Sequence, residues 1–96
     1  MRGLILSSKV QEKLASKEPP VTRGEIEECF ANRTGVYLLD QREEHKSDPP
    51  TQWFIAETDY GRKLKICFLQ YEDKIVIRTA YDPNAEELRI YAKYGS

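Results

Sequence analysis

The spacing of hydrophobic residues changes near residue 51 of this chain. Before that point apolar residues lie three or four positions apart, as Val10 and Leu14 do, which is typical of helices with one buried stripe. After it apolar and polar residues alternate, and the segments 64–71 and 75–81 are rich in β-branched and aromatic residues. These features are typical of strands. The pattern therefore predicts helices first and a sheet afterwards.

Local signals bound the first helix, which we expect over residues 8–17. A hydroxyl of Ser7 or Ser8 can accept a hydrogen bond from the first turn, and the Pro19-Pro20 pair ends the segment. Ahead of this helix, the short apolar run 3–6 predicts an edge strand.

A capping box marks the start of the second helix. Thr22 is followed three residues later by Glu25, so each side chain can bind the other residue's backbone N–H. The apolar face of this helix contains Ile26, Cys29 and Phe30. Residues 36–39 then offer a short strand.

Residues 40–50 are the most polar stretch of the chain. They contain two prolines and six charged residues in eleven positions. Such a segment cannot bury a hydrophobic face, so it is predicted to be a loop that is either functional or mobile.

The turn at 59–62 decides which side chains of the next strand face the helices. Gly61 suits a position with positive φ, but whether the turn has two residues or three stays open. With two residues, Trp53 and Ile55 face the helices; a third residue would move both to the opposite side. On the two-residue register, the helix-facing side contains Trp53, Ile55, Leu64, Ile66, Phe68, Ile75 and Ile77, packed against Val10, Leu14, Ile26 and Phe30.

A second turn, at 72–73, sets the register of the last two strands. Counting outward from a two-residue turn pairs Leu69 with Val76, Cys67 with Arg78 and Lys65 with Ala80. The side away from the helices is then expected to carry Lys63, Lys65 and Arg78 among Phe54, Cys67 and Val76.

Together these elements predict one α+β domain over residues 1–96. Its expected order is a short N-terminal strand, two helices, a three-stranded antiparallel meander and a C-terminal helix over 85–94, capped by the segment 82–84. The polar loop at 40–50 interrupts this order.

Charge and composition narrow the classes of function. Fifteen Lys and Arg oppose sixteen Asp and Glu, for a net charge of -1, so any site for a polyanion must be a local patch. No apolar run approaches the roughly 18 residues of a membrane span, and no signal peptide is evident, which favours a cytoplasmic protein without a membrane partner. The oligomeric state stays open.

The cysteines and known motifs argue against a metal or cofactor. Cys29 and Cys67 lack CxxC spacing and a histidine cluster, which disfavours a zinc site. Buried thiols are the simpler expectation, and a disulfide between them stays open. The chain also lacks a phosphate-binding Walker loop, a dinucleotide fingerprint and an HExxH motif. No cofactor is therefore expected.

Several segments of the chain resemble the RelE-like toxins of bacterial toxin–antitoxin systems. The resemblance is closest to their BrnT branch, or to a related family of small uncharacterised bacterial proteins of the same fold. The segments that carry it are Val21-Thr22, 27–30, 53–56, 61–65 and 75–80, followed by Glu87 and Tyr91.

The resemblance implies a RelE/BrnT-like fold and a metal-independent ribonuclease of a type II toxin–antitoxin system, inhibited by an antitoxin protein. RelE-like toxins bind RNA on the sheet face away from the helices. On this chain, that implies phosphate contacts by Lys63, Lys65 and Arg78, extended by Arg62. The predicted RNA-binding set also includes Arg42 from the loop, and Trp53, Phe54 or Tyr81 for base stacking.

Cleavage without a metal requires a base for the ribose 2′-OH, a cation for the phosphorane and an acid for the leaving oxygen. His45, the only histidine, is the candidate for acid–base work at neutral pH. The remaining candidates are Arg62 or Arg78 as the cation, and Glu57 or Tyr81 as the acid.

Each of these readings has a simpler alternative. The simpler reading of His45 is a solvated loop histidine, and that of the lysines and arginines is a solvated sheet face that deters aggregation. Two hypotheses therefore stand: a ribonuclease toxin-like protein, and a non-catalytic RelE-fold protein that binds a protein or nucleic-acid partner.

Overall fold

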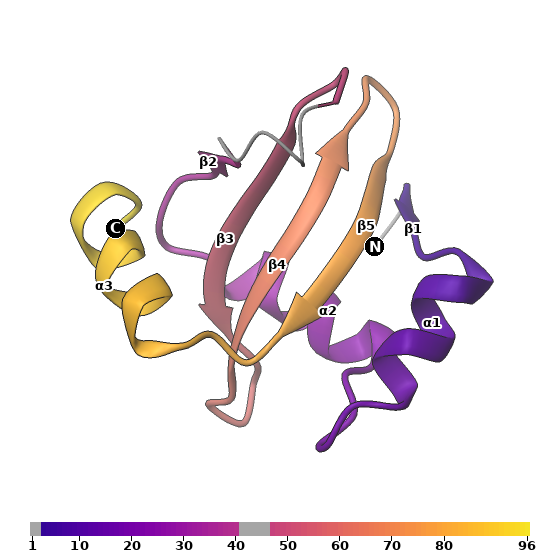
Figure 1. Ribbon diagram of the computed structural model, residues 1–96, viewed down its shortest axis with the longest axis horizontal. Coiled ribbons are helices and arrows are strands. Elements are labelled where there is room, and N and C mark those ends of the chain that lie inside the picture. Colours follow the sequence, from indigo (N-terminus) through magenta and orange to yellow (C-terminus); the bar gives the residue numbers. More distant parts are fainter. Residues whose placement is uncertain (1–2, 41–46) are drawn as a thin grey trace.

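A computed structural model describes residues 3–40 and 47–96 of the protein. The described residues form an α+β fold in which three helices pack on a five-stranded mixed sheet (Figure 1). In chain order the elements are β1 (Leu4–Ile5), α1 (Ser8–Ala15), α2 (Arg23–Asn32), β2 (Leu38–Leu39), β3 (Thr51–Glu57), β4 (Lys63–Gln70), β5 (Ile75–Tyr81) and α3 (Ala85–Tyr94).

The sheet has the strand order β1-β5-β4-β3-β2. Its three long strands, β3, β4 and β5, are antiparallel neighbours, and β1 adds to β5 in parallel. Both edge strands contain only two residues, and short edges limit pairing with other chains. The N-terminal strand predicted at 3–6 is thus confirmed as an edge strand.

The helix ends follow the local signals in the sequence. Ser7 caps α1, its hydroxyl accepting a hydrogen bond from the N–H of Val10 at 3.2 Å. The predicted capping box of α2 is present: Glu25 N–H donates to the Thr22 hydroxyl, and Thr22 N–H donates to the Glu25 carboxylate, each at 3.1 Å. Each bond satisfies a backbone donor that the first turn leaves unpaired.

The turn between β3 and β4 contains three residues, and this reverses the expected facing of β3. The N–H of Thr58 donates to the carbonyl of Arg62 at 2.8 Å, which leaves 59–61 as the loop. Gly61 has φ +84°, a conformation that suits glycine in a three-residue hairpin loop. Trp53 therefore pairs with Cys67. The two-residue alternative, which placed Trp53 and Ile55 on the side packed by the first two helices, is wrong.

A β-bulge changes the register between β4 and β5. Leu69 pairs with Val76, as expected, but the register shifts at Cys67/Phe68, so that Cys67 faces Thr79. The predicted pairing of Cys67 with Arg78 is therefore wrong, as is that of Lys65, which faces Tyr81 rather than Ala80. Arg78 is the extra residue of the bulge.

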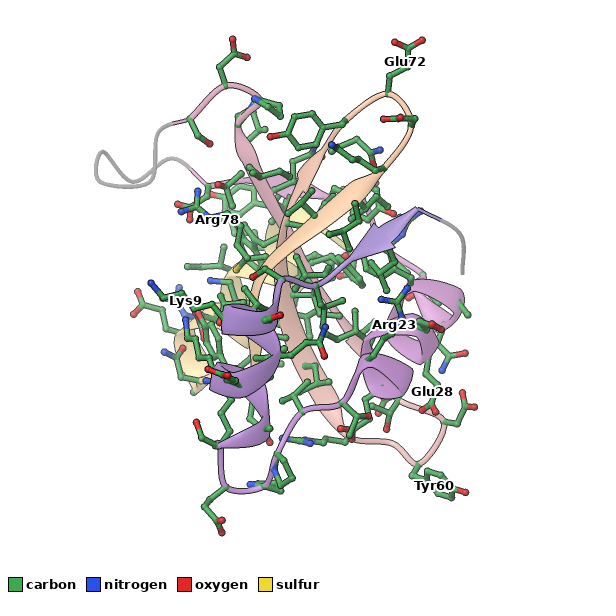
Figure 2. The ribbon with its side chains drawn as sticks, turned by 90° about the vertical axis from the view of Figure 1, so that its right-hand side faces the viewer. Lys9, Arg23, Glu28, Tyr60, Glu72 and Arg78 are labelled. Atoms are coloured by element: carbon green, nitrogen blue, oxygen red, sulfur yellow. The ribbon has the colours of Figure 1, made fainter. Side chains whose placement is uncertain are left out.

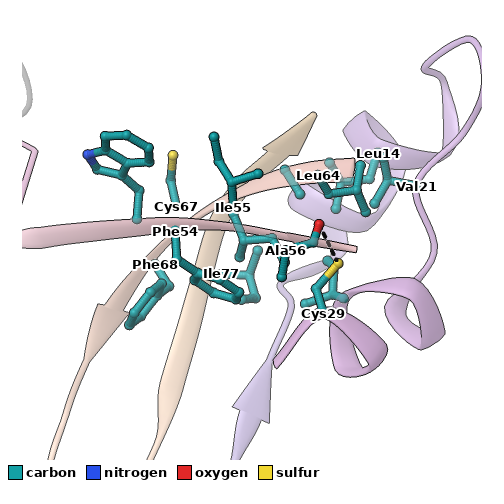
Figure 3. Close-up of a cluster of buried hydrophobic side chains, with 14 of the residues drawn as sticks. Leu14, Val21, Cys29, Phe54, Ile55, Ala56, Leu64, Cys67, Phe68 and Ile77 are labelled. Carbon is teal, nitrogen blue, oxygen red and sulfur yellow. Dashed lines mark hydrogen bonds between the residues drawn. The ribbon is translucent and has the colours of Figure 1, made fainter. Parts of the chain in front are cut away.

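The side of the sheet that faces α2 carries most of the hydrophobic core (Figure 3). Phe68 is 0% exposed, as predicted, and its ring lies 5.6 Å from that of Phe30 on α2. Phe54 and Tyr37 complete this aromatic cluster, with ring centroids 5.4 Å apart. The α2-facing core also contains Ile26, Ile66 and Ile77.

The opposite side of the sheet is only partly covered. Helix α3 lies against β3 there, and the rings of Tyr91 and Trp53 are 5.6 Å apart. Helix α1 runs beside β5 at the other edge (Figure 1). The stretch of sheet between α1 and α3 contains the groups described next, of which Arg78 is exposed and Thr79 and Tyr81 are half-buried.

Candidate nucleic-acid interface

A basic cleft of about 330 Å³ opens on the sheet face away from α2. Helix α1 forms one side, and β3, β4 and β5 form the floor. The lining residues are Lys13, Lys17, Thr51, Cys67, Arg78, Thr79 and Tyr81. Three of these described residues are cations and none is acidic, so the cleft favours an anionic ligand although the whole chain is weakly negative.

The bulge brings Arg78 into this cleft. Because the strand carries one extra residue here, both Arg78 and its neighbour Thr79 line the cleft. One guanidinium N–H of Arg78 donates to the Thr51 hydroxyl at 3.1 Å. Figure 2 shows Arg78 on the same side of the sheet as Lys9, with Arg23 and Glu28 of α2 on the other. A planar guanidinium can bind two phosphate oxygens at once.

Two lysines from the α1 region contribute to the cleft, and the site residues predicted from the sequence include neither of them. Lys13 lies near the end of α1 and Lys17 just beyond it, and the Lys17 ammonium lies 5.6 Å from the centroid of the Tyr81 ring. The available signal was the spacing of Lys9, Lys13 and Lys17, because residues four apart share one side of a helix.

A buried ion pair lies beside the cleft. Lys65 is only 6% exposed, and its ammonium donates to Glu87 of α3 at 2.8 Å. The Tyr81 hydroxyl donates to the same carboxylate oxygen at 2.6 Å, and the Lys65 ammonium lies 4.5 Å from the Trp53 ring centroid. The expected exposed position for Lys65 is therefore wrong, and its charge is already neutralised within the protein.

The pKa values of this cluster follow from burial and hydrogen bonding. Burial alone would lower the pKa of Lys65, but its hydrogen bonds to Glu87 and Tyr81 outweigh burial and raise it. For Glu87, burial favours the neutral form, yet the bonds from Lys65 and Tyr81 hold its pKa below the ordinary value. Burial, then the bond to Glu87, raises the pKa of Tyr81. The phenol therefore keeps its proton at neutral pH.

Arg62 does not line the cleft; its side chain instead links the β3–β4 hairpin to two other connecting segments of the chain. Its guanidinium donates to Asp82 at 2.6 Å and to Glu25 at 3.2 Å. It also donates to the carbonyls of Pro19 and Pro20, at 3.1 and 2.7 Å. Hydrogen bonding to Asp82 is the main reason that its pKa is raised. Arg62 thus anchors the β3–β4 hairpin to the segments before α2 and α3.

Two further predicted residues, Glu57 and Lys63, lie at the hairpin end of the sheet. They face each other across β3 and β4 and line a different groove. The structure therefore brings Arg78 and Tyr81 together in the basic cleft, while Glu57, Arg62 and Lys63 lie outside its lining.

The predicted stacking residues have different environments. Phe54 is 0% exposed in the α2-facing core, so its predicted place on the basic face is wrong. Trp53 lines a neighbouring cleft of about 310 Å³ with Asp40 and Glu86, but Tyr91 and Lys65 already pack on its ring. His45 and Arg42 lie outside the described residues.

Cys29 and Cys67 are not joined by a disulfide, which decides the question left open by the sequence. Burial, reinforced by the charge of Glu25, raises the pKa of Cys29 to about 12, and its Sγ–H donates to the carbonyl of Ala56 at 3.6 Å (Figure 3). Among residues 3–40 and 47–96, no group of three or more His, Cys, Asp or Glu is arranged to hold a metal ion.

Comparison with known proteins adds no relative. No family model matches the chain, and neither curated proteins nor solved structures show significant similarity to it. Within the described part of the chain, no helix has the length and apolar character needed to cross a membrane.

Proposed function

We propose that this protein binds single-stranded RNA across the basic cleft, using a RelE/BrnT-like arrangement of helices and sheet. The observation that carries this proposal is the grouping of Lys13, Lys17 and Arg78 around one cleft with no carboxylate among its described lining residues. Contacts between such cations and phosphates dominate affinity for nucleic acids and give it a strong salt dependence.

The shape of the cleft favours a single strand over a duplex. The cations lie around a cavity of about 330 Å³ rather than along an extended ridge. A single strand can place one phosphate at a time in such a cavity, whereas a stiff duplex presents its phosphates along a broad outer surface. The RelE/BrnT-like arrangement is supported by two helices that precede three antiparallel strands, and by a cleft on the face away from α2.

RNA cleavage without a metal is the second candidate, favoured by the position of Arg78 inside the cleft. Its guanidinium suits the charge that develops on a phosphorane during attack by the ribose 2′-OH. The Tyr81 hydroxyl keeps its proton and donates a hydrogen bond to Glu87. This hydrogen bond must break before Tyr81 can act as an acid. His45 is the proposed base, and a protein antitoxin is the proposed inhibitor, as in type II systems.

Removing the three cations of the cleft tests RNA binding. A variant with Lys13→Gln, Lys17→Gln and Arg78→Gln should bind a fluorescent single-stranded RNA more weakly at low salt. The slope of log affinity against log salt should fall by about 0.7 for each lost phosphate contact, or about 2 in total. The matched control, Lys74→Gln, Arg89→Gln and Lys93→Gln, removes the same charge from elsewhere. Equal losses in both variants would contradict a localised site.

A separate measurement tests cleavage. If His45 transfers a proton, His45→Ala should slow cleavage about 10²- to 10⁴-fold and leave RNA affinity unchanged. Expression of the wild-type chain alone in a growing bacterium should arrest growth and degrade RNA. Normal growth with intact RNA, together with RNA binding in vitro, would support the non-catalytic binding protein instead.

A further inference from the structure

The floor of the basic cleft contains a buried hydroxyl, that of Thr51. This residue is the first of β3 and is only 2% exposed, yet it lines the cleft. Its hydroxyl accepts the hydrogen bond that the Arg78 guanidinium donates at 3.1 Å. Arg78 itself is exposed, so a buried group holds the end of an exposed side chain.

This hydrogen bond crosses the middle of the sheet. Strand β4 lies between β5, which contains Arg78, and β3, which contains Thr51. Two strand spacings, about 10 Å, separate β5 from β3, so the arginine side chain extends over β4 to reach the hydroxyl. An exposed arginine otherwise samples many rotamers. The bond to Thr51 selects one in which the side chain lies across the cleft floor.

Most of the Arg78 guanidinium remains available to a ligand. A guanidinium has five N–H donors, and the bond to Thr51 uses one of those on Nη1. The edge formed by Nε and Nη2 keeps its parallel donors, which match two oxygens of one phosphate. Within residues 3–40 and 47–96, no carboxylate forms an ion pair with Arg78.

The two lysines of the cleft are held differently. The Lys17 ammonium lies 5.6 Å from the centroid of the Tyr81 ring, and Lys13 is exposed. A lysine ammonium acts as a point charge with three rotatable donors, so it does not fix the orientation of a phosphate. The lysines therefore contribute charge to the cleft, while the anchored Arg78 contributes direction as well.

We propose that Thr51 is a positioning residue, which holds the Arg78 guanidinium across the cleft floor so that its Nε and Nη2 donors bind one RNA phosphate together. This inference rests on the RNA-binding function proposed for the cleft. Because Thr51 is 2% exposed, it acts through Arg78 rather than by touching RNA. A side chain that is ordered before binding loses less conformational entropy when RNA binds.

Two substitutions at position 51 separate the hydroxyl from the rest of the side chain. Thr51→Val keeps the β-branched shape and removes the hydroxyl, whereas Thr51→Ser keeps the hydroxyl. NMR relaxation of the Arg78 guanidinium nitrogens, measured without RNA, should show a more mobile side chain in Thr51→Val and wild-type order in Thr51→Ser. Urea denaturation checks that both variants are folded.

RNA binding gives the second measurement. In fluorescence anisotropy with a single-stranded RNA, Thr51→Val should bind about three- to tenfold more weakly, as expected for the loss of one hydrogen bond. Thr51→Ser should bind as the wild type does. The slope of log affinity against log salt should stay unchanged in Thr51→Val, because no charge is removed. Arg78→Ala removes a cation and should lower this slope by about 0.7.

A double variant tests whether Thr51 acts through the arginine. Adding Thr51→Val to Arg78→Ala should cause no further loss of RNA affinity, because the group that Thr51 positions is already absent. A further loss would assign Thr51 a direct contact with RNA and overturn the positioning role.

The remaining outcomes distinguish this inference from the proposed function. If Arg78→Ala weakens RNA binding but Thr51→Val does not, the positioning role is overturned and RNA binding by the cleft stands. An Arg78 side chain that stays ordered in Thr51→Val, or an equal loss of affinity in Thr51→Ser, also overturns the positioning role. Wild-type RNA affinity in Arg78→Ala overturns both.

Discussion

The two sides of the sheet differ in packing and polarity, although both are built from alternate residues of the same strands. Toward α2, Phe54 and Phe68 pack with Phe30 and Tyr37 into a cluster of aromatic rings. On the opposite side, the alternate positions include Trp53, Lys65 and Cys67, which share their surroundings with charged groups. One side buries Phe54 and Phe68 completely, whereas the other keeps charges and clefts next to its aromatic residues.

This difference shows how a chain of 96 residues can combine a stable core with a polar site. Helix α2 closes one side mainly through the packing of Ile26 and Phe30, with hydrogen bonds such as that from Asn32 to the Glu57 carbonyl at its end. Helix α3 attaches to the other side through both the Tyr91 ring and the Lys65–Glu87 ion pair. Because α3 is held partly by an ion pair, this side of the sheet also has room for the cations of the cleft. Each buried charge, however, is stable only while its oppositely charged partner is present.

The largest effect is expected on the α2 side. Phe68→Ala should lower the free energy of unfolding by about 3 to 5 kcal/mol, because it removes a fully buried ring and leaves a cavity among the three aromatic side chains of Phe30, Tyr37 and Phe54. Urea denaturation followed by fluorescence measures this loss. The adjacent Cys67→Ala, on the other side, should cost about 1 kcal/mol. Similar losses for both would refute the division between the two sides.

A smaller effect is expected from breaking the polar attachment. Glu87→Ala should cost about 1 to 3 kcal/mol at neutral pH, because it leaves the buried Lys65 ammonium and the Tyr81 hydroxyl without their shared acceptor. Glu86→Ala is the matched control, since this neighbouring carboxylate is exposed and should change stability by less than about 0.5 kcal/mol. Adding Lys65→Met to Glu87→Ala should recover part of the loss.

The same ion pair predicts the smallest effect, a pH dependence confined to one side of the sheet. Because the folded-state pKa of Glu87 lies below the ordinary 4.5, its contribution is complete above pH 4.5 and is lost as the pH falls through the folded value. For Lys65, whose pKa is raised above 10.5, the contribution is complete below pH 10.5 and is lost as the pH rises through the raised value.

Urea denaturation between about pH 6 and pH 3 tests the acidic limb. The wild type should lose more stability over this range than Glu87→Gln, which has no carboxylate to protonate at this position. Identical curves would mean that Glu87 makes no net contribution as an anion.

Features that depend on neighbouring residues could be predicted from the sequence. The Thr22–Glu25 capping box and the alternating strands are local, so their signals lie within a few positions. The turn at 59–62 did not reveal on which side of the sheet each β3 side chain lies, because Gly61 suits both a two-residue and a three-residue loop. Only the hydrogen bond from Thr58 to Arg62 distinguishes the two loops.

The candidate site was predicted only in part. Arg78 and Tyr81, two of the predicted site residues, line the cleft. The partner of Lys65 is 22 residues away on α3, and the contribution of Lys13 and Lys17 depends on how α1 packs beside β5. The spacing of Lys13 and Lys17 places them on one side of the helix, but where that side lies against the sheet, like the partner of Lys65, arises from tertiary packing and cannot be read from one sequence.

The bulge at Arg78 brings polar side chains closer together than a regular strand allows. A regular strand shows only every second residue to one side, so functional groups on it stand almost 7 Å apart along the chain. One inserted residue lets the neighbours Arg78 and Thr79 both line the cleft, with α-carbons about 3.8 Å apart. Deleting position 78 would therefore change more than one charge: it would restore simple alternation and spread the remaining polar groups too far apart to meet one phosphate together.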